Sequence, residues 1–329
     1  MAYKIAVLMG GSSFERDFSL ASGKYVLKTL EQEGHTVLPL DTSSSLVEVL
    51  RTEKPDLAFI ALHGGNGEDG TIQSLLEYLN IPFVGSPSSV CRTTWNKSLL
   101  PHMVSAYRKG ASGMAGWPRS ICLSAVCFKD LGAATALDLL TERICSGYPY
   151  AVLPACGGSA MGISKVESPE QLPPAILEAL SFDDEVLIEE WVNGVELAVS
   201  VIGTGNAART LPPVEICPRV GFFNTEARLH ADLVDYYAPV RSLSLSPDPD
   251  VAAHICRAIE AAALEVHHSF GCRDLSRVDM YWNGSQAQVL EINVSPGMAE
   301  HSLLPLACRA AGISFGSLLN ELLDMAVSR

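Results

Sequence analysis

Residues 277–302 read RVDMYW (277–282), NGS (283–285), QAQVLEINV (286–294) and SPGMAEHS (295–302). Two runs of strand-forming residues flank an Asn-Gly turn signal, so the stretch predicts a β-hairpin. Side chains alternate across a strand, which divides polar from apolar residues between two faces. A three-residue loop sets Arg277 opposite Glu291 in the expected pairing. The same parity gathers Asp279, Glu291 and Asn293 on one polar face.

Two carboxylates and an amide oxygen are hard ligands of the kind suited to Mg²⁺, which is usually shared with substrate phosphates. The predicted cluster therefore indicates nucleotide chemistry. The competing interpretation is a solvated sheet face with an ordinary Arg–Glu pair. The loop that follows the hairpin, residues 295–302, favours the functional interpretation, because its residue types are too specific for a mere connection.

Outside the hairpin, strands and helices alternate in the first part of the chain. An apolar run at 4–9 precedes a glycine pair and a helical stripe, and a second apolar run at 56–62 precedes another glycine loop and stripe. This alternation predicts a parallel sheet covered on both sides. Two prolines and a glycine interrupt the pattern at 81–87, so we expect the first domain boundary there.

Four further segments complete the organisation. Residues 148–153 predict a strand that leads into a second glycine-rich loop at 154–162. Strands are expected at 185–188 and 195–202, and residues 303–327 predict mainly a closing helix.

Composition excludes several classes of protein. The 329 residues include 23 Lys and Arg against 37 Asp and Glu, and the net charge of −14 opposes binding to nucleic acid. The nine cysteines are scattered and odd in number and form no Cys-x-x-Cys pair, which argues against a disulfide framework or a zinc ribbon. No apolar run is long enough for a signal peptide or a membrane span. We therefore expect a cytoplasmic protein that binds neither nucleic acid nor a membrane.

Four groups of motifs resemble those of the D-alanine–D-alanine ligases. They are GGSSFER (10–16), ALHG (61–64) with GEDG (67–70), EVLIE (185–189), and LEINVSPGM (290–298) with HSL (301–303). The motifs occur in the family's order from residue 4 to the C-terminal helix, so the resemblance covers essentially the whole chain. The Glu-x-Asn-x-Ser-Pro-Gly-Met run is highly specific, whereas a glycine pair alone would be weak.

The resemblance implies an ATP-grasp fold in three parts. These are an N-terminal α/β domain at 1–87, a central α+β lobe at 88–184, and a C-terminal α+β lobe at 185–329 that carries the metal and substrate site. It also implies ATP-dependent joining of two D-alanines through a D-alanyl phosphate, for peptidoglycan synthesis. The implied cofactors are ATP and two Mg²⁺ ions, with Mn²⁺ as an alternative, and a homodimer is one option for the assembly.

The resemblance also implies roles for residues around the reaction centre. Asp279, Glu291 and Asn293 match the metal ligands, and Arg277 matches the guanidinium that stabilises the acyl phosphate. Glu15 matches the carboxylate that holds the first D-alanine's ammonium group. The other residues that match substrate contacts are His63, Arg228, Gly297, Ser302 and Leu303.

Nucleotide contacts follow from the same resemblance, and the residues that match them are Lys97, Gly158, Ser159, Glu189, Trp191 and Glu196. Together with Glu15 and Arg277, Ser159 forms the implied catalytic set. Without the family, Trp191 would be interpreted as a buried tryptophan and Glu15 as a helix N-cap or a surface carboxylate.

The chain departs from the family pattern at Leu153, at Gly157, where the family usually has an acidic residue, and at the pair Arg228-Leu229. Leu153 stands where a second phosphate-binding lysine is usual, and the loss of such a charge-assisted contact predicts a roughly ten- to hundred-fold fall in nucleotide affinity or rate. Arg228-Leu229 stands where the active-site loop usually carries Lys-Tyr, so closure of the loop would depend on apolar contact or on His230. These departures leave two alternatives open. One is a ligase that uses D-lactate or D-serine as its second substrate, and the other is a weakly active nucleotide-binding relative.

Overall fold

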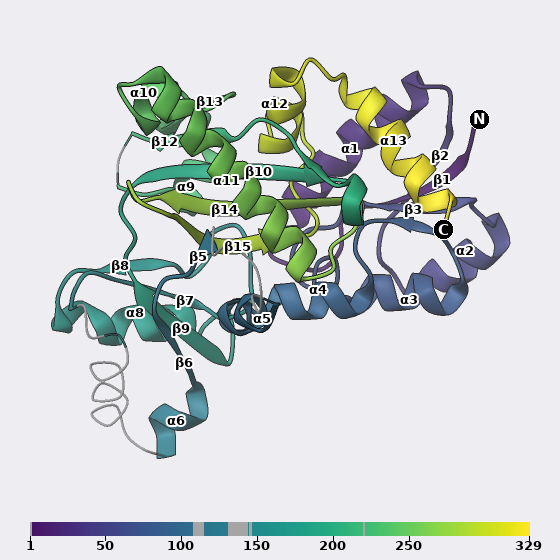
Figure 1. Ribbon diagram of the computed structural model, residues 1–329. Helices are drawn as coiled ribbons and strands as arrows, with labels where there is room; N and C mark the ends of the chain where they lie inside the picture. The colour runs from purple at the N-terminus through teal and green to yellow at the C-terminus, as the bar shows by residue number, and fades with distance from the viewer. Residues whose placement is uncertain (1, 108–114, 131–143, 145–146, 220) are drawn as a thin grey trace.

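The computed structural model describes residues 2–107, 115–130, 144, 147–219 and 221–329. Three β-sheets form its framework, as Figure 1 shows. The first lies at the N-terminal end of the molecule, the second beside α8, and the third and largest runs under the long helix α11.

The first sheet is parallel and has the strand order β2-β1-β3-β4. Its strands are β1 (Lys4–Leu8), β2 (Thr36–Leu40), β3 (Leu57–Ile60) and β4 (Phe83–Val84). Helices α1 (Arg16–Gln32) and α13 (Phe315–Val327) pack on one face, and α2 (Leu46–Glu53) and α3 (Thr71–Leu79) on the other. The expected parallel sheet with two covered faces is therefore confirmed.

The second sheet is antiparallel and has the order β6-β9-β7-β8, with α8 (Leu172–Ala179) packed against it. Its strands are β6 (Ser120–Ser124), β7 (Tyr150–Pro154), β8 (Ser164–Val166) and β9 (Glu185–Glu190). Strand β9 pairs with β6 and β7, although the predicted boundary at 184 assigned it to the C-terminal lobe. This pairing places β9 in the second sheet, because strand order in space does not follow order along the chain, while the boundary itself stays a prediction. The other domain limits stay predictions.

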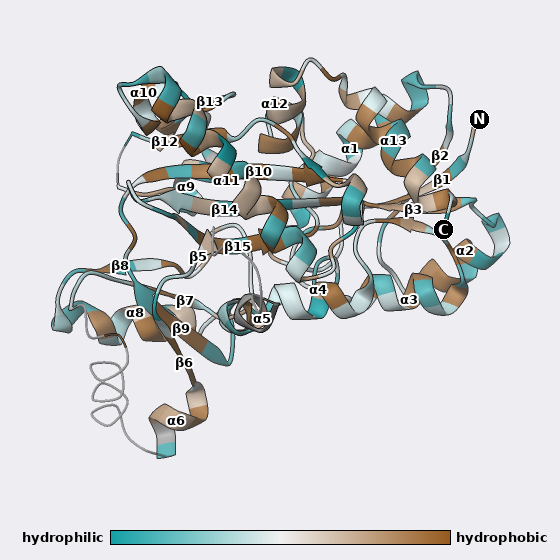
Figure 2. Cartoon of the chain, viewed as in Figure 1, coloured by the Kyte–Doolittle hydropathy of each residue, from teal (hydrophilic) through white to brown (hydrophobic). Residues whose placement is uncertain are grey.

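The third sheet has the order β13-β12-β10-β14-β15-β5, with β11 paired to β10. Its strands are β5 (Ala115–Gly116), β10 (Val195–Ile202), β11 (Arg209–Thr210), β12 (Val214–Pro218), β13 (Val234–Tyr237), β14 (Leu275–Trp282) and β15 (Ala287–Asn293). Helix α11 (Pro249–Ser269) buries its apolar stripe against one face of this sheet. Figure 2 shows brown apolar and teal polar segments alternating along α11 and α3, as expected for helices with one buried side.

Short helices connect these layers. They are α4 (Ser88–Trp95), η1 (Lys97–Leu99), α5 (Leu100–Tyr107), α6 (Ala125–Asp130), η2 (Pro169–Gln171), η3 (Gly205–Ala207), α9 (Thr225–Leu229), η4 (Ala231–Leu233), α10 (Ser242–Leu245) and α12 (Leu303–Ala310). The predicted closing helix at 303–327 is in fact two helices, α12 and α13, because the turn at Gly312 has φ +71°.

The hairpin β14–β15 has a different register from the predicted one. Arg277 lies opposite Asn293, and Asp279 lies opposite Glu291, whereas from Met280 onward the pairing shifts by one residue. The predicted pairing of Arg277 with Glu291 is therefore wrong by two positions. The extra residue of a β-bulge at Leu290 brings the polar side chains of the two strands onto one face, an effect that the sequence prediction attributed to a three-residue turn. The predicted polar face still forms, because Arg277, Asp279, Glu291 and Asn293 all lie on the side away from α11.

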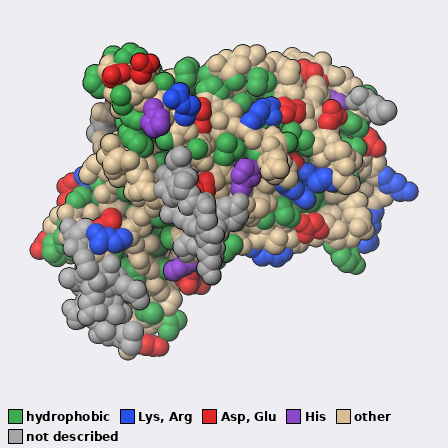
Figure 3. Space-filling model, in the orientation of Figure 1, with side chains coloured by type: hydrophobic (Ala, Val, Ile, Leu, Met, Phe, Trp, Pro, Cys, Tyr) green, Lys and Arg blue, Asp and Glu red, His purple; other side chains and the backbone are tan. Residues whose placement is uncertain are grey.

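On the face shown in Figure 3, acidic and basic side chains are scattered among one another. No single helix in the described part of the chain is long and apolar enough to cross a membrane, although α12 and α13, bent by 105°, pass that test as a pair by length and composition.

Candidate active site

Two adjoining cavities lie where the three sheets meet, with volumes of about 480 and 120 Å³. Every site residue predicted from the sequence lines at least one of them. The larger is lined by Glu15, His63, Arg277, Asn293, Gly297, Ser302 and Leu303 together with Ser159; the smaller by Glu189, Trp191, Glu196 and Asp279; and both by Lys97, Gly158, Arg228 and Glu291.

The first sheet supplies one wall of the larger cavity. Glu15 follows β1 and precedes α1, while His63 follows β3, so both lie at the carboxyl ends of parallel strands, where ligand sites of open α/β sheets form. Glu15 is only 7% exposed. Burial raises the pKa of its carboxyl group, and the negative charge of Glu68 raises it further. This wall therefore holds a buried acidic group that a cation would stabilise.

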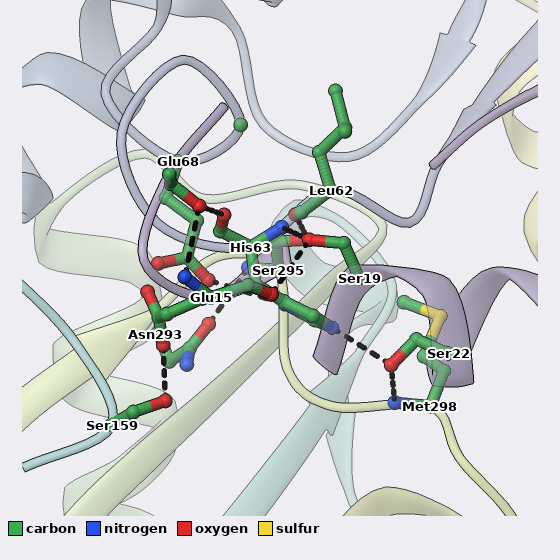
Figure 4. A network of polar contacts seen from close by, with 12 residues as sticks. Glu15, Ser19, Ser22, Leu62, His63, Glu68, Ser159, Asn293, Ser295 and Met298 are labelled. Carbon is green, nitrogen blue, oxygen red and sulfur yellow. Dashed lines mark hydrogen bonds and ion pairs between the residues drawn. The ribbon is translucent and has the colours of Figure 1, made fainter. Parts of the chain in front are cut away.

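A network of polar contacts fixes this wall (Figure 4). His63 Nε2 lies 2.8 Å from Ser22 Oγ, and its Nδ1 lies 3.6 Å from Glu68 Oε1. Ser22 Oγ also accepts a 3.1 Å hydrogen bond from the backbone N–H of Met298. Helix α1 is thus tied to the loop after β15, although the two are 276 residues apart in sequence.

The second sheet brings the glycine-rich loop against Glu15. The Ser159 hydroxyl donates a hydrogen bond to the Glu15 carboxylate. A Cβ on Gly158 would lie 2.9 Å from Glu15 Oε2, so a larger residue here would have to displace that carboxylate. Ser159 itself has φ +53°, in the left-handed region. Near the same junction Phe14 packs edge-on against Phe182, with ring centroids 5.9 Å apart.

The third sheet contributes the charged face of β14 and β15. Arg277 is 5% exposed and donates from Nε and Nη2 to the two Asp279 oxygens, each at 2.7 Å. Lys97 Nζ lies 3.6 Å from Glu291 Oε2. Burial raises the pKa of Glu291, but the positive charges of Lys97 and Arg228 outweigh burial and lower it. Glu291 is therefore ionised between these cations.

The predicted metal ligands lie together, but each already has a partner. The carboxyl groups of Asp279 and Glu291 face each other within hydrogen-bonding distance, and Asn293 Oδ1 accepts from the Ser295 N–H at 2.9 Å. Each oxygen retains a further lone pair for a metal ion. Among the described residues, no group of three or more His, Cys, Asp or Glu side chains is arranged to hold a metal. The predicted set differs from such a group in having two acids and one amide.

The smaller cavity combines an apolar lining with several acids, of which Glu189 and Glu196 have strongly raised pKa values. Burial raises the pKa of both Glu189 and Glu196 to about 7, and Glu196 accepts a 2.7 Å hydrogen bond from the Tyr281 hydroxyl. Trp191 forms an edge-on contact with Phe222 at 5.4 Å between centroids. Leu153 lines this cavity and is 5% exposed, so the position where the family has lysine is apolar here.

Residues 221–230 lie across the junction of the cavities. Arg228 lines both and stacks over Phe223, with its Cζ atom 4.5 Å from the ring centroid. The polar contact of this segment with the glycine-rich loop comes from Thr225, whose hydroxyl donates to the Ser159 carbonyl oxygen at 3.1 Å. His230 is exposed and lines neither cavity, so the expectation that it closes the loop is not supported. The side chain of Leu229 lies outside the described residues.

The loop after β15 closes the far end of the larger cavity. Ser302 is the N-cap residue of α12, and its side chain makes no capping hydrogen bond within the described residues. Gly297 lies directly beside it, because an added Cβ would be 3.1 Å from Ser302 Oγ. Helix N-termini attract anions through unsatisfied N–H groups. This end of the cavity therefore suits a carboxylate.

Several lining residues were missed by the sequence analysis. Glu68 lies within the quoted GEDG motif, which was a usable signal. Tyr281 follows Asp279 by two residues in the quoted hairpin, so its place on the same face was also a usable signal. Ser22 and Phe223 carry no motif, and only the packing of distant segments shows that they belong to the site.

Known proteins resemble this chain in both sequence and fold. Family models match the chain as the D-ala D-ala ligase C-terminus over residues 133–324 and the D-ala D-ala ligase N-terminus over residues 47–86. A D-alanine–D-alanine ligase of Geobacter sulfurreducens is 35% identical over 325 residues, which cover 98% of this chain and 94% of that protein.

Two solved structures resemble the whole chain. A D-alanine–D-alanine ligase from Bacillus anthracis complexed with ATP has a TM-score of 0.79 and 27% identity, and the match covers 99% of this chain and 98% of that one. The VanG D-Ala:D-Ser ligase from Enterococcus faecalis has a TM-score of 0.80 and 26% identity, with 99% and 100% covered. The fold is therefore that of the ATP-grasp ligases. Within that class, the chain belongs to the D-alanine–D-alanine ligase family.

Proposed function

We propose that this chain is an ATP-dependent ligase that joins two D-alanines, releases ADP and phosphate, and supplies peptidoglycan synthesis. The observation that carries the proposal is that Lys97, Arg228 and Glu291 line both cavities. A nucleotide in the smaller cavity and an amino acid in the larger would therefore meet at one charged junction. The family and the ATP-bound relative support this assignment of the cavities.

The larger cavity has opposite electrostatic ends that suit an amino acid pair. The Glu15 carboxylate is buried beside Glu68, and an ammonium group would relieve the cost of that burial. At the other end, the N-terminus of α12 at Ser302 and Leu303 offers N–H groups to a carboxylate. We assign the first substrate's ammonium to Glu15, with His63 nearby, and the second substrate's carboxylate to the Ser302 end beside Gly297.

The smaller cavity suits adenosine, with its phosphates at the junction. Trp191 and other apolar residues of this cavity would contact the base, and the carboxylates of Glu189 and Glu196 would accept hydrogen bonds from ribose hydroxyls. Lys97 and the backbone at Gly158 and Ser159 lie toward the junction, where they would hold phosphate oxygens.

The residues at the junction fit Mg²⁺. Asp279 and Glu291 turn their carboxyl groups toward each other in a buried setting, which a divalent cation would stabilise, and Asn293 lies on the same face. A bound Mg²⁺ supplies charge neutralisation of the triphosphate and Lewis-acid character.

The reaction uses these groups in two steps. The carboxylate of the first D-alanine attacks the γ-phosphorus, which breaks its bond to ADP and forms D-alanyl phosphate. The amine of the second D-alanine then attacks the acyl carbon, phosphate leaves, and the amine loses a proton. Arg277, fixed by Asp279, lines the larger cavity where negative charge develops on the acyl phosphate and tetrahedral species.

The test is product identification with competing nucleophiles. Purified protein receives ATP, Mg²⁺ and equal concentrations of D-alanine, D-serine and D-lactate, and products are identified by mass spectrometry. We expect D-alanyl-D-alanine as the main product, with ADP and phosphate in equal amounts. D-serine is included because the VanG enzyme shares the fold at a similar TM-score. A main product that contains D-serine or D-lactate would show that this compound, and not D-alanine, is the second substrate. If no product forms, the protein is a nucleotide-binding relative without ligase activity.

A further inference from the structure

We propose that Thr225 is a positioning residue that holds α9 against the glycine-rich loop and thereby fixes Arg228 over both cavities. This inference rests on the ligase function proposed above. It assigns a role to a hydroxyl that neither the motifs nor the comparisons single out.

The contact joins all three parts of the molecule. The Thr225 hydroxyl donates to the carbonyl oxygen of Ser159 at 3.1 Å, and the Ser159 hydroxyl donates to Glu15. Thr225 lies between β12 and β13 of the third sheet, Ser159 between β7 and β8 of the second, and Glu15 between β1 of the first sheet and α1. Ser159 therefore accepts a hydrogen bond from Thr225 and donates one to Glu15, and so connects the glycine-rich loop to both neighbouring parts.

Ser159 needs such support because of its backbone. Its φ of +53° is followed by φ +57° at Ala160, and in this left-handed region a Cβ atom comes too close to the following carbonyl oxygen. A strained loop persists only where surrounding contacts hold it. Thr225 fixes the orientation of the Ser159 peptide group, and Glu15 fixes the side chain.

Thr225 also determines where Arg228 lies. Helix α9 spans only Thr225–Leu229 and is capped by Asn224, whose side chain accepts from the Ala227 N–H at 2.9 Å. Thr225 and Arg228 are three residues apart and therefore lie on the same side of this helix. The positively charged guanidinium of Arg228 lines both cavities and stacks over Phe223. A short helix with no other hydrogen bond to the glycine-rich loop among the described residues would move this charge if the Thr225 contact were lost.

The test compares Thr225→Val, which keeps the side-chain shape without the hydroxyl, with Thr225→Ser, which keeps the hydroxyl. Thr93→Val is the matched control, because Thr93 donates within its own helix to Ser89 and lines neither cavity. The first readout is hydrogen–deuterium exchange of residues 221–230 without substrates. We expect exchange about five-fold faster in Thr225→Val and parent-like exchange in Thr225→Ser and Thr93→Val.

The second readout is steady-state kinetics with D-alanine and ATP. In Thr225→Val we expect the KM for D-alanine to rise about five-fold with a smaller change in kcat, and more phosphate to be released per dipeptide. Thr225→Ser restores both quantities to within two-fold of the parent. If Thr225→Val matches the parent in both exchange and kinetics, or if Thr225→Ser behaves like the valine variant, the inference is wrong. Parent protein that makes no dipeptide refutes the proposed function instead, and the exchange comparison still decides the role of Thr225.

Discussion

At the scale of single residues, the smaller cavity, where we propose that the nucleotide binds, combines apolar side chains with acids of raised pKa. Leu153 is buried in its lining, while the nearby acids Glu189 and Glu196 are partly protonated near neutral pH because burial raises their pKa to about 7. Each feature has a measurable consequence for nucleotide affinity.

Replacing Leu153→Lys should strengthen ATP binding. An ammonium group on this wall gains a charge-assisted contact with phosphate, so we expect the Kd for ATP to fall roughly ten-fold. Isothermal titration calorimetry measures the change, with Leu153→Met as an uncharged control of similar volume. Equal affinity in the lysine and methionine variants would show that the position does not reach the phosphates.

ATP affinity should also increase with pH between 6 and 8. A raised carboxyl pKa means that the ionised form, the better acceptor for ribose hydroxyls, is reached only as pH rises through about 7. The Kd should therefore fall over this interval, and it should change less in the double variant Glu189→Gln, Glu196→Gln. The measurement uses conditions under which the protonation of the ATP phosphates does not change. A Kd that is constant from pH 6 to 8 in the parent would contradict this account.

At the scale of elements, the sequence predicts types well and pairing poorly. Alternating polarity identified β14 and β15 and the face that carries Asp279 and Glu291. Their register could not be predicted, because the bulge at Leu290 leaves no mark in a single sequence. The observed turn is also shorter than expected, since the Asn283 N–H bonds to the Gln286 carbonyl oxygen and leaves two residues between them. The shorter turn and the bulge each shift the strand pairing by one residue, and together they restore the alternation that puts the polar side chains on one face. The predicted polar face is therefore correct although the predicted register is wrong.

Strand order and long-range contacts were the other limits. Strand β9 pairs with β6 and β7 of the second sheet. The order of the segments along the chain near residue 184 did not predict this pairing. Thr225 and Ser22 act through partners 66 and 276 residues away. Such contacts depend on packing of separate elements, so a single sequence carries no local pattern for them.

At the scale of the whole molecule, Arg329 joins the first and third sheets. Its guanidinium forms an ion pair with Asp274, just before β14, and Nη2 donates to the carbonyl oxygen of Phe83 in β4 at 2.8 Å. Asp274 is fully buried, with Gly85 N–H as a second donor at 2.9 Å. Removing Arg329 would leave this buried carboxylate without its ion-pair partner.

We therefore expect Arg329→Met to lower the free energy of unfolding by about 2 kcal/mol, because the fully buried Asp274 carboxylate loses its ion-pair partner. Urea denaturation monitored by circular dichroism measures this change. Lys165→Met is the control, since it removes a partly exposed pair with Glu167 and should cost less than about 1 kcal/mol. Similar losses in both variants would contradict the role given to Arg329.

The central claim is that the charged face of β14 and β15 is where phosphoryl transfer and ligation occur. The most direct test is the rate of D-alanyl-D-alanine synthesis in Glu291→Gln, with Glu53→Gln as a control at an exposed ion pair. The account predicts a fall of roughly a hundred-fold in kcat for Glu291→Gln. Its melting temperature should stay near that of the parent, and Glu53→Gln should remain fully active. A Glu291→Gln protein that makes the dipeptide within two-fold of the parent's rate would contradict the claim.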